Sequence, residues 1–300
     1  MAIGKSVNRL VRGIALATLC AAGSSAYADL LPLWEIQGSG NRVYLLGSVH
    51  FLRPSDYPLP AGIEAAYADA DELVMEIDLD DLDSTEAQTI TSRMAIDGDD
   101  LPTSIGAKAY AEAQALAATV GIDLQPLMPF EPWFAALMIT QIRMLQMGFD
   151  PAWGIETQLG ERADHDGKPI SGLETLAGQL AFMDTLDADT QRLFLLESLK
   201  DEAETEDEMQ TVMSAWHSGD MAVLAELQSK LMRDAPRLGD ALFTRRNRNW
   251  VPQIIELTKQ NKNYLVIVGA MHLAGEGSVL ELLAEKGIRA KQLSDERTER

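Results

Sequence analysis

Apolar positions along the chain fall into short runs that alternate with loops and helical stretches. Residues 33–37 and 42–46 are β-prone, and Gly38-Ser39-Gly40-Asn41 between them is typical of a hairpin turn. Residues 61–70 have the composition of a helix, and another apolar run follows at 72–78. This order of strand, loop, helix and strand predicts a parallel crossover unit near the start of the fold.

The last part of the chain repeats this arrangement. Residues 265–268 form an apolar, β-prone run, and Gly275-Glu276-Gly277-Ser278 provides turn and N-cap residues. We expect a helix over 279–286, ended by Gly287, and a last strand over 288–293. A further short strand is expected at 169–173, after a helix over 155–164. Together these elements predict an α/β fold, with a central mixed sheet and βαβ units at both ends of the chain.

The middle of the chain, roughly 100–245, predicts a largely helical insertion. Residues 107–120 are rich in alanine, and 177–231 are mostly helical in pattern. The stretch 132–147 has a broad apolar face, interrupted by Gln141, Arg143 and Gln146, which argue against a membrane span. We interpret it as a buried helix, with a partner-binding face as the alternative. No linker interrupts the chain, so we expect one domain over 29–300.

The first 28 residues have the features of a cleaved export signal. Lys5, Arg9 and Arg12 precede a short apolar stretch, and Ala26-Tyr27-Ala28 fits a signal-peptidase site before Asp29. A lipid anchor at Cys20 is the alternative, but the preceding leucine fits that signal poorly. We therefore expect a soluble protein of the periplasm or the extracellular space, without a stable membrane span. Because Cys20 is the only cysteine, the mature chain would contain neither disulfides nor thiolate sites.

The charge of the chain restricts its partners. The full sequence has 25 basic and 46 acidic side chains and a net charge of −21. Removal of the three basic residues of the signal leaves 22 against 46, or −24. Such a surface repels nucleic acid and anionic membranes, whereas it suits cationic ligands or metal ions. Solubility alone explains most of these acidic residues.

A four-residue pattern occurs twice, and each copy follows a predicted strand. Gly47-Ser48-Val49-His50 follows the second strand, and Gly269-Ala270-Met271-His272 follows the strand at 265–268. The carboxyl ends of strands in an α/β sheet are where ligands and catalytic groups gather. We therefore predict a site that contains both His50 and His272. The alternative is that each is a buried strand-end histidine with a satisfied hydrogen bond.

A metal ion is one use of such a pair. Neutral imidazoles together with a carboxylate suit Zn, Mn or Co and leave positions open for water and substrate. Glu76 ends an apolar strand, where a charge is costly unless it is paired or bound to a cation. We therefore predict His50, Glu76 and His272 as metal ligands; alternatively, one histidine is a ligand and the other a base, and Glu76 is either a ligand or the general base.

Four further residues are candidates for the same site. Arg246 lies in the basic cluster 245–250 and could stabilise an oxyanion or bind a substrate carboxylate, or simply neutralise neighbouring acids. Asn247 is next to it. Glu156 begins a helix, whose dipole it could complement, and Glu174 follows the predicted strand at 169–173, as a supporting or capping residue.

Several of these residues belong to a longer series of short motifs. The chain resembles the TraB/GumN (PrgY) group, which is related to the Tiki proteins. The matching stretches, in chain order, are Leu33-Trp34, Gly47-Ser48-Val49-His50, Tyr57-Pro58-Leu59-Pro60, Glu76, Gly154-Ile155-Glu156, Leu173-Glu174-Thr175, Trp216 with Gly219-Asp220, Arg246-Asn247 and Val268-Gly269-Ala270-Met271-His272-Leu273. They extend over nearly the whole mature chain.

The resemblance implies an activity and a role for these residues. Tiki-like members are metal-dependent proteases built around two Gly-x-x-His motifs, which implies that His50 and His272 are ligands or bases and that Glu76 and Arg246 are in the site. More distant relatives are erythromycin-esterase-like hydrolases, in which a histidine acts without metal, and a haem-binding lipoprotein. Plasmid-encoded members are pheromone-shutdown factors. We expect the chain to lack the membrane anchors of Tiki and of many TraB proteins.

These observations together predict an exported, metal-dependent hydrolase. It would cleave an amide or ester bond in a peptide or small-molecule substrate, with Arg246 steadying the developing oxyanion. The alternatives are a metal- or haem-binding protein without turnover, a protein that sequesters a peptide, and a metal-free hydrolase that relies on histidine.

Overall fold

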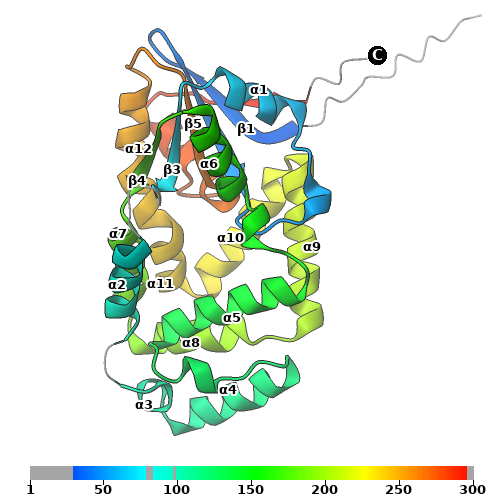
Figure 1. Cartoon of the computed structure of the whole chain (residues 1–300), viewed down its shortest axis with the longest axis vertical. Helices are drawn as coiled ribbons and strands as arrows, with labels where there is room; N and C mark the ends of the chain where they lie inside the picture. The colour runs from blue at the N-terminus through cyan, green and yellow to red at the C-terminus, as the bar shows by residue number, and fades with distance from the viewer. Residues whose placement is uncertain (1–29, 79–83, 97–98, 296–300) are drawn as a thin grey trace, which may run out of the picture.

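The computed structural model describes residues 30–78, 84–96 and 99–295. The predicted export signal, residues 1–28, lies outside the described residues. The molecule has two parts, a β-sheet flanked by helices and a helical layer beside one edge of that sheet (Figure 1). The predicted combination of a mixed sheet, formed from both ends of the chain, with a helical middle region is confirmed.

Six strands form the sheet, in the order β4-β3-β5-β2-β1-β6. Their bounds are β1 (Leu30–Gln37), β2 (Arg42–Ser48), β3 (Glu72–Ile77), β4 (Ile170–Glu174), β5 (Tyr264–Gly269) and β6 (Lys291–Ser294). Strands β4, β3, β5 and β2 are neighbours and run parallel, whereas β1 is antiparallel to β2 and β6. The carboxyl ends of four adjacent strands therefore meet along one edge, which is the place where such sheets bind ligands.

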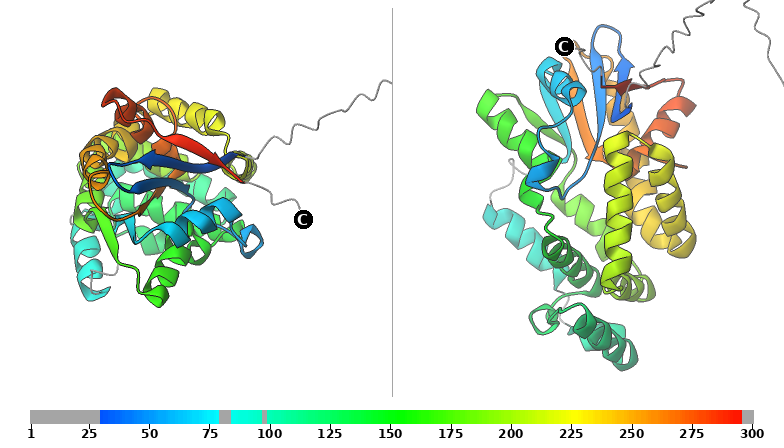
Figure 2. Two further views of the ribbon diagram at one scale, coloured as in Figure 1. Left: turned by 90° about the horizontal axis from the view of Figure 1, so that it is seen from above. Right: turned by 90° about the vertical axis from the view of Figure 1, so that its right-hand side faces the viewer.

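Alternation along the strands directs side chains to two faces. In β3, Leu73 and Met75 pack in the core beneath α1 (Ala61–Asp69) and α6 (Ile155–Asp166). Val74 points the other way, into the core beneath α12 (Arg245–Leu257) and α13 (Val279–Glu285). Figure 2 shows these two pairs of helices on opposite faces of the sheet. Because side chains alternate with a period of two, Glu76 lies on the α12 side.

The helical layer is formed by the middle of the chain. Its helices are α2 (Ser84–Ala95), α3 (Leu101–Ile105), α4 (Ala107–Thr119), α5 (Pro132–Gln146), α7 (Leu176–Asp184), α8 (Ala188–Ser198), α9 (Glu202–Ser218), α10 (Met221–Asp234) and α11 (Pro236–Gly239). Two apolar clusters hold this layer together, and Trp133 and Ile139 of α5 are fully buried. The predicted burial of this helix therefore holds for the centre of its apolar face, whereas Leu145 near its end is 47% exposed.

Short helical turns connect these elements. They are η1 (Pro54–Asp56), η2 (Gln125–Leu127), η3 (Pro151–Trp153), the π-helical turn η4 (Asp240–Thr244) and η5 (Ala270–Leu273). In the described part of the chain, no helix is both long and apolar enough to span a bilayer.

The last strand starts later than the sequence indicates. The predicted bounds were 288–293, but β6 begins at Lys291. Gly287 has a φ of 79°, and the Ile288 N–H donates back to the carbonyl of Leu283. Ile288 therefore closes the end of α13, in the left-handed ending that glycine favours, and the chain reaches β1 only afterwards.

Candidate functional site

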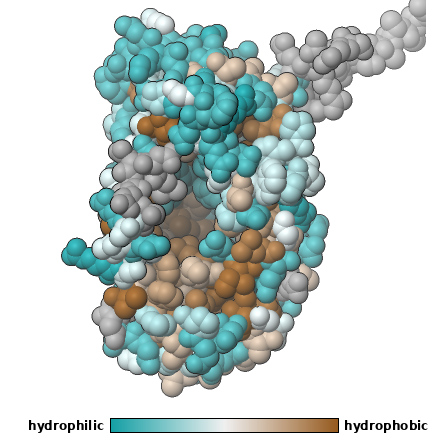
Figure 3. Space-filling view, in the orientation of Figure 1, coloured by the Kyte–Doolittle hydropathy of each residue, from teal (hydrophilic) through white to brown (hydrophobic). Residues whose placement is uncertain are grey.

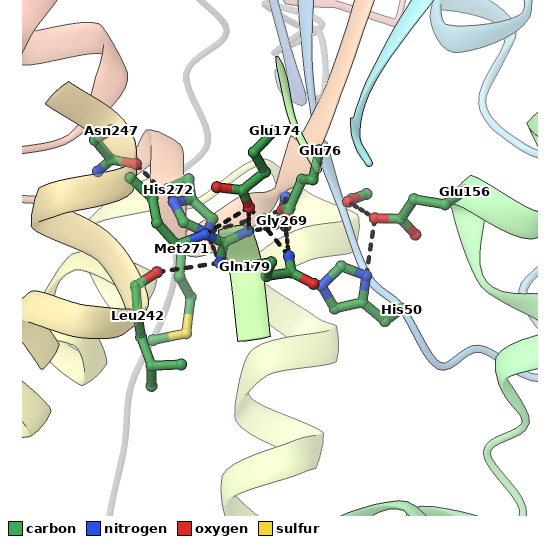
Figure 4. Close-up of polar contacts among 12 residues, drawn as sticks. His50, Glu76, Glu156, Glu174, Gln179, Leu242, Asn247, Gly269, Met271 and His272 are labelled. Atoms are coloured by element: carbon green, nitrogen blue, oxygen red, sulfur yellow. Dashed lines mark hydrogen bonds and ion pairs between the residues drawn. The ribbon is translucent and has the colours of Figure 1, made fainter. Parts of the chain in front are cut away.

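Residues from four neighbouring strand ends meet at the carboxyl edge of the sheet. Glu174 ends β4, Glu76 lies near the end of β3, Gly269 ends β5 and Ser48 ends β2. This order follows the order of the strands in the sheet. The two Gly-x-x-His motifs thus leave adjacent parallel strands, and His50 and His272 lie on either side of Gly269 (Figure 4).

His272 is buried and held in one tautomer. It lies in η5, only 4% exposed, with its ring 4.4 Å from that of Trp250 and 5.2 Å from that of Phe243. The Asn247 amide group donates to the carbonyl of Gly277, so its Oδ1 accepts from Nδ1 of His272 at 2.6 Å. Nε2 of His272 therefore carries a lone pair rather than a proton.

The surroundings of His272 keep it neutral. Burial lowers its pKa from 6.5 to about 3, with Arg246 acting in the same direction and Glu76 opposing it. Nε2 of His272 accepts from Nη1 of Arg246 at 3.3 Å and lies 3.8 Å from Oε1 of Glu76. A neutral imidazole of this kind is an acceptor or a metal ligand at physiological pH.

All five N–H groups of the Arg246 guanidinium have acceptors. Nε donates to Glu174 at 2.8 Å, and Nη2 donates to both Glu174 and Glu76. Nη1 donates to the Leu242 carbonyl at 3.2 Å and to His272. The guanidinium in this arrangement fixes two carboxylates and an imidazole. To stabilise an oxyanion, as the sequence suggested, it would have to release one of these partners.

An irregular start of helix α12 places the Arg246 side chain in the site. The π-helical turn η4 runs directly into α12, and Arg246 is the second residue of that helix. Such turns widen a helix by one residue and are frequent at functional sites. Here the Leu242 carbonyl accepts from the Arg246 side chain, and Arg246 and Asn247 are both buried.

The two carboxylates beside Arg246 differ in pKa. Burial works against the charge of Glu76, but His272, Arg246, His50 and the Gly269 N–H lower its pKa to about 2. Oε1 of Glu76 accepts from that N–H at 2.8 Å. Burial raises the pKa of Glu174, with Glu76 adding to the effect and Arg246 opposing it. Gln179 donates to both carboxylates, at 3.2 Å each.

His50 forms the accessible side of the site. Its side chain is 55% exposed, and its Nδ1 lies 2.9 Å from Oε1 of Glu156. Ser48 donates to the same carboxylate oxygen. Glu156 reaches His50 because α6 begins against the loop, where a Cβ on Gly154 would lie 2.3 Å from the His50 carbonyl oxygen. Burial opposes the charge of Glu156, but His50 and Ser48 lower its pKa.

The charge of Glu156 raises the pKa of His50 from 6.5 to about 9. Its protonation therefore stabilises the fold fully below about pH 6.5, and this contribution is lost as the pH rises through about 9. We expect the Glu156→Gln variant to move this pKa down, toward 6.5. Titration of the four histidines by NMR, assigned by single substitutions, would measure it. An unchanged His50 pKa in Glu156→Gln would contradict this pairing, whereas His272 should stay neutral from pH 5 to 9 in both proteins.

The two histidines and Glu76 face one small volume beside Gly269. A methyl group built on Gly269 would lie 3.4 Å from Oε1 of Glu76, 3.5 Å from Nε2 of His50 and 3.5 Å from Cδ2 of His272. The absence of a side chain at Gly269 leaves this volume open to a water molecule, an ion or a substrate atom. A strand-end glycine is thus part of the site.

The donor set beside Gly269 fits a divalent metal ion in chemical kind. Two imidazoles and a carboxylate suit such an ion, and each imidazole has its second nitrogen fixed, as metal-bound histidines do. The site also has a net negative charge when both imidazoles are neutral, because it contains one guanidinium and three carboxylates, those of Glu76, Glu156 and Glu174. Among the described residues, however, no three His, Cys, Asp or Glu side chains are grouped closely enough to hold an ion as they stand. Binding would require these side chains to move toward the ion.

The structure places all the predicted site residues together. His50, Glu76, Arg246 and His272 surround Gly269 directly or through one contact, and the secondary candidates Glu156, Glu174 and Asn247 each bind one of them. Ser48, Gln179 and Gly269 were not predicted as site residues. Ser48 and Gly269 lie inside the repeated motifs, which is a signal for them, whereas nothing in the sequence distinguishes Gln179.

Residues 32–292 match the sequence model of the TraB/PrgY/gumN family. The chain belongs to the TraB/PrgY/gumN family. The resemblance inferred from the motifs is thereby confirmed. The matched range includes both Gly-x-x-His motifs and every candidate site residue.

Relatives of this TraB/PrgY/gumN protein are found in several bacteria. The uncharacterized protein YbaP of Escherichia coli K12 is 25% identical over 266 residues, which are 84% of this chain and 92% of YbaP. YbaP of Shigella flexneri shows the same identity and coverage. An uncharacterized protein of Treponema pallidum is 23% identical over 269 residues, which are 84% of this chain and 80% of that protein. No solved structure matches the chain.

Proposed function

We propose that this protein is an exported hydrolase that cleaves an amide or ester bond in a peptide or small-molecule substrate. His50 would move the proton, and Glu76 and His272 would hold a divalent metal ion. The observation that supports this proposal is the convergence of His50, His272 and Glu76 on the open volume beside Gly269. The Tiki-like proteins that the chain resembles are proteases built around the same two motifs.

The pKa values of the two histidines are shifted in opposite directions, which suits them to different roles in the reaction. His50, with a pKa of about 9, carries a proton at Nε2 near neutral pH and can donate it to a leaving group. His272 stays neutral, and its Nε2 lone pair accepts from Arg246, so a metal ion would have to displace that N–H to bind it. Pairs of titratable groups whose pKa values are pushed apart are typical of acid–base sites.

The other residues orient these groups. Glu76 is ionised, and its Oε1 can accept a hydrogen bond from the attacking water while Arg246 and the Gly269 N–H hold the carboxylate in place. Glu156 holds the His50 ring so that Nε2 faces the open volume. When bound, a divalent ion would polarise the substrate carbonyl and lower the pKa of a bound water. His50 becomes a third ligand only without its Nε2 proton, so metal affinity should rise with pH.

Gly269→Ala tests this proposal. The φ and ψ of Gly269, −50° and 134°, suit alanine, and the added methyl would make ordinary contacts only, so the fold should persist. Because the methyl fills the open volume, we expect turnover to fall by about tenfold or more, together with a loss of bound Mn, Co or Zn. Hydrolysis of nitrophenyl esters and fluorogenic peptides, and metal analysis of the purified proteins, would measure both effects.

Gly40→Ala is the matched control, because a methyl group there meets nothing within 4 Å. It should leave turnover and metal content unchanged. Equal turnover by Gly269→Ala and the original protein would defeat the proposed site. Full activity after treatment with EDTA would contradict the proposed metal ion. The protein would then be a hydrolase that relies on His50 without a metal.

A further inference from the structure

A cavity of about 490 Å³ lies inside the helical layer, next to the site. Helices α5, α8, α9 and α10 form its walls, and Leu242 and Met271 line the part nearest the sheet. The molecule is hollowed between the sheet and the lower helices, and residues in this hollow are hydrophobic (Figure 3).

The cavity adjoins the candidate site through Leu242 and Met271, which line its wall. Met271 precedes His272 in η5, and its carbonyl accepts from Gln228 of α10 at 3.3 Å. The Leu242 carbonyl accepts from Arg246. Both side chains lie beside His272 in Figure 4. A group that extends from a carbonyl beside Gly269 toward these two residues would enter the cavity.

The walls are apolar and adaptable. They are formed mainly by Met144, Leu193, Phe194, Met209, Val212, Leu227, Leu231, Leu238, Leu242 and Met271. Methionine side chains adjust to ligands of different shape. A ligand in this cavity is therefore held by the burial of its own apolar surface.

Several charged and polar side chains of the lining bind one another or the backbone. Lys230 pairs with Glu208 at 3.2 Å, and Lys200 pairs with Glu197 at 2.7 Å. Arg143 donates to the carbonyl of Ser198. An extended peptide would need hydrogen-bond partners along its whole backbone, whereas an aliphatic chain needs none and suits walls that are mostly apolar.

The volume indicates the length of that chain. At about 30 Å³ for each methylene-sized group, the volume of a water molecule in the liquid, a cavity of about 490 Å³ has room for roughly 16 such groups, so a chain of about ten carbons fits inside it. This exceeds the side chain of leucine or phenylalanine. We propose that the cavity binds the aliphatic chain, of about ten carbons, of an acyl group whose carbonyl lies beside Gly269.

This inference rests on the proposed function, since it places the scissile carbonyl at that site. Water adds to the carbonyl carbon of the acyl ester, the bond to the leaving oxygen breaks, and that oxygen takes a proton. A fatty acid and an alcohol are released. Each further buried methylene should raise affinity about fourfold, which corresponds to about 0.8 kcal/mol.

The test combines binding and turnover. Binding of decanol, which cannot be hydrolysed, would be measured by calorimetry, and kcat/KM would be measured for nitrophenyl acetate, hexanoate and decanoate. Val212→Phe and Leu227→Trp add bulk to two different walls of the cavity. Gln210→Phe adds the same ring as Val212→Phe to the exposed side of α9 and serves as the control.

We expect decanol to bind the original protein and Gln210→Phe alike, and at least tenfold more weakly to both cavity variants. Decanoate should be hydrolysed with at least tenfold higher kcat/KM than acetate, and Val212→Phe should remove this preference, whereas Gln210→Phe should keep it. Equal decanol binding by all four proteins, or no binding to any, would overturn the inference. Decanol binding without hydrolysis of any ester would support the acyl-binding cavity and contradict the proposed function. Acetate hydrolysis without decanol binding would support the proposed function and contradict the acyl-binding cavity.

Discussion

Replacement of Arg246 by methionine is expected to lower the free energy of unfolding by about 3–5 kcal/mol. The guanidinium side chain is 8% exposed and lies between Glu76 and Glu174, whose side chains are 8% and 10% exposed. Methionine has a similar length but leaves two buried carboxylates without their cation. Removal of one partner from a buried ion pair is costly because the remaining charge is uncompensated. Urea denaturation, followed by circular dichroism, would measure the change.

The pH dependence of this loss identifies its cause. In the original protein the pKa of Glu76 is lowered to about 2, so its contribution to stability is present above about pH 4.5 and is lost as the pH falls through about 2. Without Arg246 the pKa values of both carboxylates rise, and they take up protons on folding at mildly acidic pH. The destabilisation should therefore be larger at pH 8 than at pH 5.

Arg248→Met provides the matched control for this variant. Arg248 lies on the same helix but is exposed, so its replacement should change stability by no more than about 0.5 kcal/mol. If Arg246→Met and Arg248→Met unfold at the same urea concentration, the buried cluster does not hold the site together.

The fold was predictable from local patterns in the sequence because its elements have strong local signals. The hairpin turn, the β-prone runs and the glycine that ends α13 indicated the strands and their flanking helices to within a few residues. The order of strands in the sheet was not predictable in this way. Strand β5 lies between β2 and β3, although it follows them by most of the chain, because only tertiary packing determines where a late strand is inserted.

The site residues were predictable where chemistry makes them unusual. A charge at the end of an apolar strand and two histidines after strands are conspicuous, and Glu76, His50 and His272 do meet. The role of Arg246 was less accessible, since nothing in its sequence neighbourhood indicates a π-helical turn or five engaged donors. Gln179 binds two carboxylates, but a glutamine in a helix gives no signal. The indole of Trp216 donates to the Gly47 carbonyl at 2.7 Å, a contact across 169 residues that no local pattern encodes.

Replacement of His50 by alanine is expected to lower kcat/KM by about 10²–10⁴-fold, the range typical for loss of a general acid or base. His50 contributes little to the core, because its side chain is 55% exposed, so the variant should remain folded. His50→Asn is a second variant, since its amide nitrogen can take the place of Nδ1 beside Glu156 while Nε2 is absent. Both variants should lose turnover to a similar extent, which would separate the function of Nε2 from the support given to Glu156.

His165→Ala is the control for His50→Ala. His165 is 87% exposed on α6 and pairs with Asp166, so its loss should not change kcat/KM. Turnover by His50→Asn that matches the original protein would show that Nε2 moves no proton in the reaction. In that case the raised pKa of His50 would reflect only its pairing with Glu156, and the acid–base role would have to lie with another group that faces the open volume beside Gly269. Glu76 is the ionised group there. Turnover should then be lost in Glu76→Gln and kept in His50→Asn when the two variants are measured side by side.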